Sequence, residues 1–323
     1  MIKVEHLSKS FGHTKAVDNI SFEVAEGNNL ILLGTSGCGK TTTLKMINRL
    51  IEHDHGNIYI DGKNILEQQP ETLRRGIGYV LQNNGLFPHY TIAENIAVVA
   101  QLLKWDEKRI KRRVSELLEK LHLDQKHLSA YPHELSGGQQ QRVGLARALV
   151  TDPPVLLMDE PFGALDTVTR AKIQAEFKAL DELKRKTIVM VTHDVQEAFE
   201  LGDRICLMDK GKIIQNGTPA DLLFKPANGF VKDFLKDQRL QLEFKAIRLK
   251  DIAPLLPSAD GGVFEFHKEV LPADVSFWHI LEEFKFSKTE HLQVIDYNRK
   301  KTTISFEDLM SAFYQYKTHR AHE

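Results

Sequence analysis

Short apolar runs separated by turn-forming residues fill the first 85 residues of the chain. Gly, Asn and Asp cluster between these runs, which cover residues 2–7, 20–24, 29–33, 57–62 and 77–82. This pattern is typical of β-strands joined by turns. One stretch of helical character, residues 41–50, interrupts them.

From about residue 84 to residue 135 the apolar positions follow a helical period instead. Thr91 is placed to cap a helix, and Glu94 three residues later completes a capping box. Residues 106–123 predict a strongly amphipathic helix. Its predicted buried stripe consists of Ile110, Val114, Leu117, Leu118 and Leu121. The basic cluster at residues 104–113 is interleaved with acidic residues, so we expect it to be a solvated helix face.

Strands and helices alternate again from residue 155 to about residue 215. Residues 155–158 and 187–192 are apolar runs of the kind found in parallel sheets that are covered on both faces. Residues 204–217 predict a β-hairpin that turns at Lys210 and Gly211. These patterns predict an α/β lobe with a mainly parallel sheet, and a helical lobe of about residues 84–150 inserted into it.

The last part of the chain, residues 238–323, has a different character. Residues 277–286 and 305–317 are helical in pattern, residues 291–296 are β-like, and residues 255–262 are rich in Pro and Gly. We therefore expect a main domain of residues 1–237 and a small α+β accessory domain of residues 238–323.

The segment GTSGCGKT between the apolar run at residues 29–33 and the helical stretch matches the phosphate-loop pattern G-x-x-x-x-G-K-[ST] at every position. Glycines let such a loop turn its backbone N–H groups toward phosphate oxygens, and the following helix start adds partial positive charge. Lys40 would reach the β- and γ-phosphates, and the Thr41 hydroxyl would hold Mg²⁺. The expected nucleotide-binding residues of the loop are Gly34, Thr35, Ser36, Gly37, Cys38, Gly39, Lys40, Thr41 and Thr42.

Residues 155–160, VLLMDE, supply acidic groups at the end of a predicted central strand. Asp159 is placed to support Mg²⁺, directly or through water. Glu160 is placed to act as the general base on an attacking water. Without the phosphate loop, this run would indicate only a strand that ends in a solvated acidic turn. Together with the phosphate loop, it indicates the second half of the nucleotide site.

A second motif, LSGGQ at residues 135–139, makes the chain resemble the ATP-binding cassette (ABC) ATPases. A helix is predicted over Gly137–Leu149, directly behind this signature loop. Within one subunit, the signature loop has no phosphate to bind. In the family, it completes the ATP site of the opposite subunit. The resemblance therefore implies that Ser136, Gly138 and Gln139 cap the γ-phosphate bound to a second copy of the chain.

Further residues match the family in order along the chain. Phe11 takes the place of the aromatic residue that stacks on adenine, although the family more often has Tyr there. Gln82 matches the glutamine that contacts Mg²⁺ and the attacking water. Asp166 lies in the loop that crosses the dimer interface, and His193 matches the switch histidine that contacts the γ-phosphate.

The resemblance covers residues 1 to about 237 and implies a P-loop NTPase of the α/β class. Its expected parts are a mainly parallel sheet core, an antiparallel β subdomain and an inserted helical subdomain. It also implies ATP hydrolysis with Mg²⁺ in a head-to-tail homodimer. The implied catalytic residues are Glu160, His193, Gln82 and Lys40, and the implied metal ligands are Thr41, Gln82 and Asp159.

Composition supports this class and excludes others. The 323 residues are 42% hydrophobic and 27% charged with a formal net charge of −1, so nothing indicates a nucleic-acid partner. Two cysteines cannot form a disulfide framework and fit a reducing compartment. The N-terminus lacks the apolar core of a signal peptide, and no apolar run approaches the ~18 residues of a membrane span. A peripheral position on the cytoplasmic face of the cell membrane, with pore-forming permease subunits as partners, is the expectation.

Within the family, residues 78–99, 202–223 and 227–235 resemble ATPases of glycine betaine, carnitine or choline importers. Such systems also use a substrate-binding protein. Importers of polyamines, sulfate or iron share several of the same motifs and remain the alternative. A soluble ABC protein acting on DNA or ribosomes, or a pure nucleotide sensor, is a weaker alternative, since the chain has one cassette with all its motifs intact.

The end of the chain, residues 291–313, resembles the end of a CBS (cystathionine-β-synthase) repeat, which relatives in the osmoprotectant branch often carry in two copies. Residues 238–323 are too few for two full repeats, so a truncated, degenerate CBS-like domain is expected. Regulatory nucleotide binding and a scaffold or dimer-contact role are both open for it.

Overall fold

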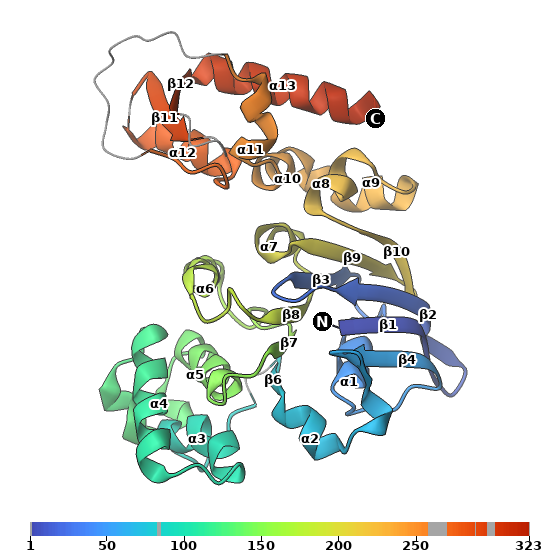
Figure 1. Ribbon diagram of the computed structural model, residues 1–323, viewed down its shortest axis with the longest axis vertical. Helices are drawn as coiled ribbons and strands as arrows, with labels where there is room; N and C mark the ends of the chain where they lie inside the picture. The colour runs from blue at the N-terminus through green and yellow to red at the C-terminus, as the bar shows by residue number, and fades with distance from the viewer. Residues whose placement is uncertain (1, 83–84, 258–269, 288, 296–300, 323) are drawn as a thin grey trace. The chain divides into compact units, whose positions relative to one another are not determined.

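The computed structural model describes residues 2–82, 85–257, 270–287, 289–295 and 301–322 (Figure 1). The chain divides into two compact units, residues 1–216 and residues 217–323. No helix within the described ranges is both long and apolar enough to cross a membrane.

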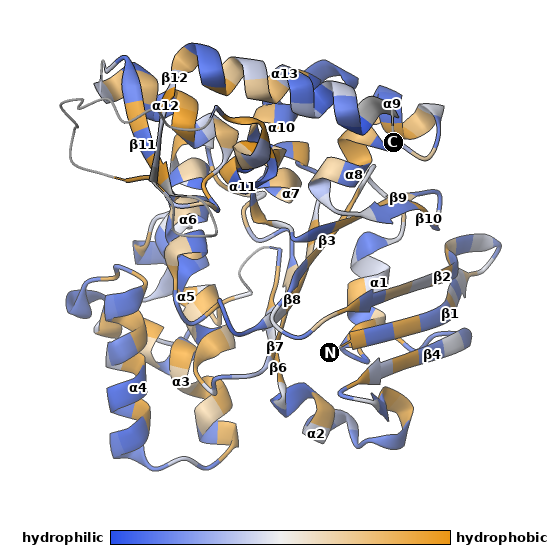
Figure 2. Ribbon diagram, turned by 45° about the horizontal axis from the view of Figure 1, so that its top comes forward, coloured by the Kyte–Doolittle hydropathy of each residue, from blue (hydrophilic) through white to orange (hydrophobic). Residues whose placement is uncertain are grey.

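The first unit contains a four-stranded antiparallel sheet in the order β2-β1-β4-β5. Its strands are β1 (Ile2–Phe11), β2 (Thr14–Val24), β4 (His55–Ile60) and β5 (Lys63–Asn64). Apolar and polar residues alternate along β1 and β2, as Figure 2 shows, and the apolar set is buried. One face of this sheet therefore belongs to the core and the other faces solvent.

The main sheet of this unit has six strands in the order β10-β9-β3-β8-β7-β6. They are β3 (Asn29–Gly34), β6 (Ile77–Val80), β7 (Val155–Asp159), β8 (Thr187–Thr192), β9 (Arg204–Asp209) and β10 (Lys212–Gly217). The pairs β9–β3, β3–β8, β8–β7 and β7–β6 are parallel. Consequently β3, β7 and β8 all end at the same edge of the sheet, which is where open parallel sheets place their ligands.

This unit also contains four helices outside the helical lobe: α1 (Lys40–Ile47), α2 (Pro70–Arg75), α6 (Thr167–Ala179) and α7 (Val195–Leu201). Leu44, Met46 and Ile47 of α1 join the hydrophobic core formed with strands of both sheets. This packing fixes the helix that follows the phosphate loop. The predicted turn at Lys210 and Gly211 is confirmed, since both residues have positive φ angles (45° and 80°) between the neighbouring strands β9 and β10.

The inserted helical lobe consists of α3 (Ile92–Leu102), α4 (Glu107–Lys120) and α5 (Gly137–Leu149), with short 3₁₀ turns at Gln125–Ser129 and Pro132–Glu134. The Thr91–Glu94 capping box is present at the start of α3. All five residues of the predicted apolar stripe, from Ile110 to Leu121, are buried. The amphipathic pattern of α4 was thus sufficient to predict which side of this helix packs inward.

The second unit contains α8 (Pro219–Phe224), α9 (Gly229–Leu235), α10 (Arg239–Ala246), α11 (Leu249–Ile252), α12 (Phe277–Ser287), β11 (His291–Ile295), β12 (Lys301–Ser305) and α13 (Phe306–His322). Its own core is rich in aromatic residues, and Phe277 and Phe313 are fully buried there. Strands β11 and β12 pair antiparallel, and Leu271 forms a parallel bridge to Val294. The predicted helices and the β-like run of this region are present, while residues 258–262 of the Pro/Gly-rich stretch lie outside the described residues.

This unit begins at Gly217, before the expected boundary after Asp237. The reason is that α8 and α9 pack with the helices that follow them. The Arg239 guanidinium of α10 donates a hydrogen bond of 2.9 Å to the Leu223 carbonyl of α8.

Candidate functional site

The phosphate loop connects β3 to α1 and is shaped by two glycines that tolerate no side chain. A Cβ on Gly34 would lie 2.1 Å from the carbonyl oxygen of Met208, and one on Gly39 would lie 2.2 Å from that of Ala16. Both glycines also have positive φ angles, 153° and 104°. The loop is therefore held tightly against β9 and β2 in a conformation that only glycine permits.

Lys40 lies at the centre of this loop. Its side chain is almost fully buried, and its Nζ donates hydrogen bonds of 2.8 Å to the carbonyl oxygens of Gly34 and Thr35. No carboxylate of the described residues forms an ion pair with it. Its third partner is Sγ of Cys38 at 3.7 Å. A buried ammonium bonded only to uncharged groups is a strong attractor for an anion. The residues present therefore fit a bound nucleotide phosphate.

Cys38, within the same loop, is buried and unpaired. Burial raises the pKa of its thiol above the ordinary value, which disfavours the nucleophilic thiolate.

Thr41 and Asp159 meet at the sheet edge. The Thr41 hydroxyl donates a hydrogen bond of 2.7 Å to Oδ1 of Asp159. Asp159 is buried and forms no ion pair within the described residues, and burial raises the pKa of its carboxyl group. A hydroxyl beside a buried, uncompensated carboxylate is a donor set that suits Mg²⁺.

Two other predicted residues, Gln82 and His193, contact the same carboxylate oxygen of Glu160. Oε2 of Glu160 accepts a hydrogen bond of 3.0 Å from Nε2 of Gln82 and lies 3.1 Å from Nδ1 of His193. These side chains come from the segments after β6, β7 and β8, three parallel strands that are neighbours in the sheet. Parallel pairing therefore assembles residues that are far apart in the sequence.

The backbone of Glu160 is strained. Its φ angle is +45°, a left-handed conformation that costs a residue with a side chain roughly 1–2 kcal/mol. Its N–H donates a hydrogen bond of 3.0 Å to the Val191 carbonyl, which anchors the turn to β8. Strain of this kind persists where the surrounding structure enforces it, and it is common at active sites.

Phe11 stands at the end of β1, where the β1–β2 hairpin turns. Its side chain is 50% exposed, and the Lys9 ammonium lies 5.5 Å from the ring centroid. An exposed aromatic ring has a free face on which a base can stack, whereas a core phenylalanine would not. The position is compatible with the role implied by the family resemblance.

Ser136 caps the start of α5 together with Gln139. The Ser136 hydroxyl accepts a hydrogen bond from the Gln139 N–H, and Oε1 of Gln139 accepts one of 2.8 Å from the Ser136 N–H. Gly138 packs against α6, where a Cβ would lie 2.9 Å from Cγ2 of Thr169. Asp166 caps the start of α6 by accepting hydrogen bonds from the N–H groups of Val168 and Thr169.

The signature loop and the phosphate loop do not meet within the chain. No hydrogen bond or ion pair in the described part of the molecule joins Ser136, Gly138 or Gln139 to residues 34–42. Helices α5 and α1 lie on different sides of β6 and β7 in both Figure 1 and Figure 2. The site contained in one chain is therefore one half of the arrangement that the motifs imply.

Comparison with known proteins identifies the family. A family model described as ABC transporter matches residues 17–163. Over 310 residues the chain is 47% identical to the glycine betaine/carnitine/choline transport ATP-binding protein of Bacillus subtilis, an alignment that covers 94% of this chain and 82% of the relative. The chain belongs to the ABC transporter family. It is an ATP-hydrolysing subunit of this family, as the resemblance implied.

Further comparisons confirm the fold and the nucleotide. This ABC ATPase is 45% identical over 314 residues to the glycine betaine uptake system ATP-binding protein of Escherichia coli, covering 96% of this chain and 99% of the relative. Among solved structures, a dimeric ATP-binding cassette in a post-hydrolysis state with ADP and Pi aligns with a TM-score of 0.61 at 33% identity. That alignment covers 68% of this chain and 98% of the other. The predicted P-loop NTPase fold and the prediction of ATP as ligand are thereby confirmed.

The structure also reveals residues that the sequence motifs did not single out. Arg170 of α6 donates a hydrogen bond of 3.0 Å to the Leu165 carbonyl, and its guanidinium lies 3.1 Å from Oδ2 of Asp194. Asp194 follows His193 directly and caps α7. Arg170 thus connects the loop at Asp166 to the segment that carries His193. A pair separated by 24 positions has no local signature, so periodicity could not have revealed it.

Proposed function

We propose that this ABC ATPase drives the uptake of a quaternary amine such as glycine betaine, carnitine or choline. The observation that carries the proposal is the extent of similarity to two relatives whose names state such substrates. Both alignments cover more than nine tenths of this chain, and so include most of the C-terminal unit as well as the ATPase unit. A generic cassette would share the ATPase unit alone.

The working form is a head-to-tail homodimer. Each chain holds a phosphate loop with the buried ammonium of Lys40. Each also presents Ser136 and Gly138 at a helix start that has no anion partner among the described residues of its own chain. The dimeric cassette with ADP and Pi shows that relatives of this fold associate in pairs. ATP favours the closed dimer, because only there are all of its phosphate oxygens satisfied.

In the closed site, Glu160 accepts the proton of the attacking water, and Gln82 and His193 hold its carboxylate in place. Thr41, Asp159 and Gln82 are the proposed holders of Mg²⁺, which supplies charge stabilisation for the transferred phosphoryl group. Phe11 stacks on the adenine, and Asp166 lies at the seam between the two copies.

The surface that contacts the permease is proposed to include residues 85–91, which lie directly before α3. The fully buried side chain of Asn95 holds this segment by donating hydrogen bonds to the carbonyls of Phe87, Tyr90 and Thr91. The side chain of Phe87 is 40% exposed. A rigid loop with an exposed aromatic residue suits docking to a permease at the cytoplasmic face of the membrane, where a substrate-binding protein delivers the solute from the other side.

The test is an uptake measurement in the cell of origin, with the chromosomal copy changed to Lys40→Ala. Uptake of labelled glycine betaine, carnitine or choline should fall to the background level, while uptake of sulfate, iron and polyamines should not change. Unchanged uptake of all three amines, with loss of one of the other solutes, would move the protein to another importer branch.

The metal proposal is tested separately with Asp159→Asn. The variant should need a Mg²⁺ concentration at least about tenfold higher for half-maximal ATPase activity, because a charged oxygen ligand is lost. An unchanged Mg²⁺ dependence would remove Asp159 from the metal site.

A further inference from the structure

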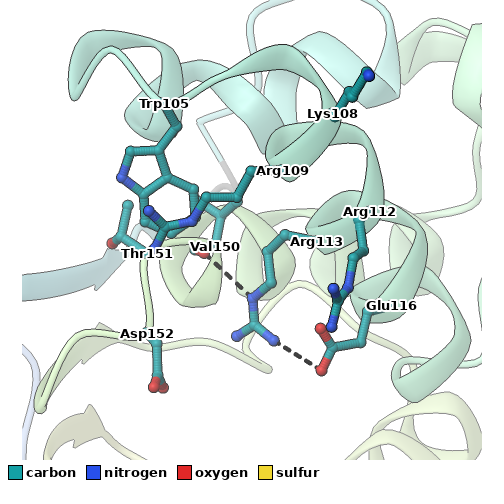
Figure 3. A pocket seen from close by; sticks show the side chains of 9 residues that line it. All are labelled: Trp105, Lys108, Arg109, Arg112, Arg113, Glu116, Val150, Thr151 and Asp152. Atoms are coloured by element: carbon teal, nitrogen blue, oxygen red, sulfur yellow. Dashed lines mark hydrogen bonds and ion pairs between the residues drawn. The ribbon is translucent and has the colours of Figure 1, made fainter.

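A hollow of about 720 Å³ lies in the helical lobe, between one side of α4 and residues 150–152 (Figure 3). Trp105, Arg109, Arg112, Arg113 and Glu116 are among its lining residues. Trp105 precedes α4, and the other four recur along α4 at helical spacing, so the helix presents them together on one side. Lys108, Arg109 and Arg112 are exposed, as expected for a solvated helix face, and they line this hollow as well.

The charges of this hollow do not balance. Four cationic side chains line it, Lys108 and three arginines, against the two carboxylates of Glu116 and Asp152, which leaves an excess of two positive charges. Both carboxylates are already paired. Glu116 lies 3.0 Å from Arg113 and 2.6 Å from Lys120, and Asp152 forms an ion pair with Lys186. Within the described residues, no carboxylate forms an ion pair with Lys108, Arg109 or Arg112.

Two of the arginines are held in place before any ligand arrives. The guanidinium of Arg109 lies over the Trp105 ring at 3.4 Å from its centroid, a cation–π contact. Arg113 donates hydrogen bonds to the carbonyls of Leu149 and Val150 and pairs with Glu182 at 2.9 Å. Figure 3 shows the side chains of Arg109, Arg112 and Arg113 extending from α4, whereas the Lys108 side chain extends in another direction.

The hollow is separate from the ATP site. Residues 150–152 precede the amino end of β7, and Asp159 of the ATP site stands at the carboxyl end of the same strand. The two sites therefore lie at opposite ends of β7.

We propose that this hollow binds a phosphate-bearing anion through the guanidinium groups of Arg109 and Arg112. A phosphate dianion matches the two guanidinium charges of Arg109 and Arg112, which form no ion pair within the described residues, and the planar guanidinium fork matches phosphate oxygens better than a point charge does. The same chemistry is offered by a free phosphorylated metabolite and by the headgroup of an anionic lipid.

The test uses the full-length protein carrying Lys40→Ala, so that the phosphate loop does not dominate the signal, and titrates it calorimetrically with inorganic pyrophosphate at fixed ionic strength. Adding Arg109→Gln and Arg112→Gln should weaken binding at least about tenfold, since charge-assisted hydrogen bonds are lost. The control is the pair Lys104→Gln and Lys111→Gln, which removes the same charge from the same region outside the hollow and should leave the affinity unchanged. Equal affinities in the two double variants would overturn the proposal.

A second measurement distinguishes the sources of the ligand. The fraction of protein that sediments with phosphatidylglycerol vesicles is compared with the fraction that sediments with phosphatidylcholine vesicles. If the ligand is a lipid headgroup, the original protein should prefer the anionic vesicles, and the Arg109/Arg112 variant should lose this preference. If sedimentation is the same for both double variants while pyrophosphate affinity differs, the ligand is a soluble phosphate compound. The single variant Arg112→Gln excludes misfolding as the cause of weaker binding, because Arg112 makes no hydrogen bond or ion pair within the described residues. This variant alone should weaken pyrophosphate binding severalfold.

Discussion

At the scale of single residues, the most informative feature is the convergence of Gln82 and His193 on one oxygen of Glu160. The carboxylate is held by two neighbours at 3.0 and 3.1 Å, and its backbone is strained at a φ angle of +45°. A side chain fixed in this way cannot rotate freely, so its position is set before a substrate arrives.

This arrangement makes Glu160→Gln the informative substitution. The amide keeps the shape and the contacts but cannot accept a proton from water, so we expect the turnover rate to fall at least about a hundredfold. ATP affinity should stay within about twofold of the original, because Glu160 does not lie in the phosphate loop. Equilibrium binding and steady-state hydrolysis measure the two effects. A variant that hydrolyses ATP normally contradicts the base assignment.

A second residue, Glu197 of α7, makes stability depend on pH. Its carboxyl group is buried, which raises its pKa to about 7 even though it accepts a hydrogen bond from Gln174. Between pH 4.5 and about 7 the folded state therefore keeps a proton that the unfolded chain has released. The contribution of this group to the free energy of unfolding is fully present at low pH and is lost as the pH rises through about 7.

Glu197→Gln should remove this dependence. Between pH 5 and pH 8 the original protein should lose up to about 3 kcal/mol more unfolding free energy than the variant, since one pKa unit corresponds to ~1.36 kcal/mol. Urea unfolding at the two pH values measures the difference. Identical pH dependence in both proteins would show that Glu197 titrates normally.

At the scale of elements, the sequence predicted most of what positions the site. The phosphate loop, the capping box of α3 and the buried stripe of α4 are local patterns, and each was found at the expected residues. The family resemblance implied that Glu160 and His193 are catalytic residues, and parallel strand pairing brings Nδ1 of His193 to 3.1 Å from Oε2 of Glu160. The contacts of Arg170 and the unpaired arginines on α4 could not be predicted, because they depend on how distant segments pack.

Arg170 connects α6 to α7 and is expected to be a positioning residue. Arg170→Ala should lower the turnover rate about tenfold or more, because the loop at Asp166 and the segment of His193 lose their link. ATP affinity of the monomer should be unchanged, and Arg170→Lys should restore part of the rate. The matched control is Lys178→Gln, which breaks another ion pair between the same helices, 2.6 Å from Glu200, away from both loops. If both substitutions slow hydrolysis equally, Arg170 has only a structural role.

At the scale of the whole molecule, the central claim is that a complete ATP site needs two chains. In the part of one chain that the structure describes, no hydrogen bond or ion pair joins the signature loop to the phosphate loop that carries Lys40, and the helix capped by Ser136 has no anion partner. In a symmetric homodimer, the signature loop of each chain completes the ATP site of the other, so the dimer contains two complete sites.

Mixing two inactive variants tests this claim most directly. Lys40→Ala destroys the phosphate loop, and Ser136→Arg blocks the signature loop, so each variant alone should be inactive. In a mixed dimer, the intact phosphate loop of one chain meets the intact signature loop of the other, so an equal mixture should regain up to about a quarter of the original sites. Hydrolysis that rises above the sum of the two variants is the predicted result. A mixture no more active than that sum, with mixed dimers shown to form, would contradict the account.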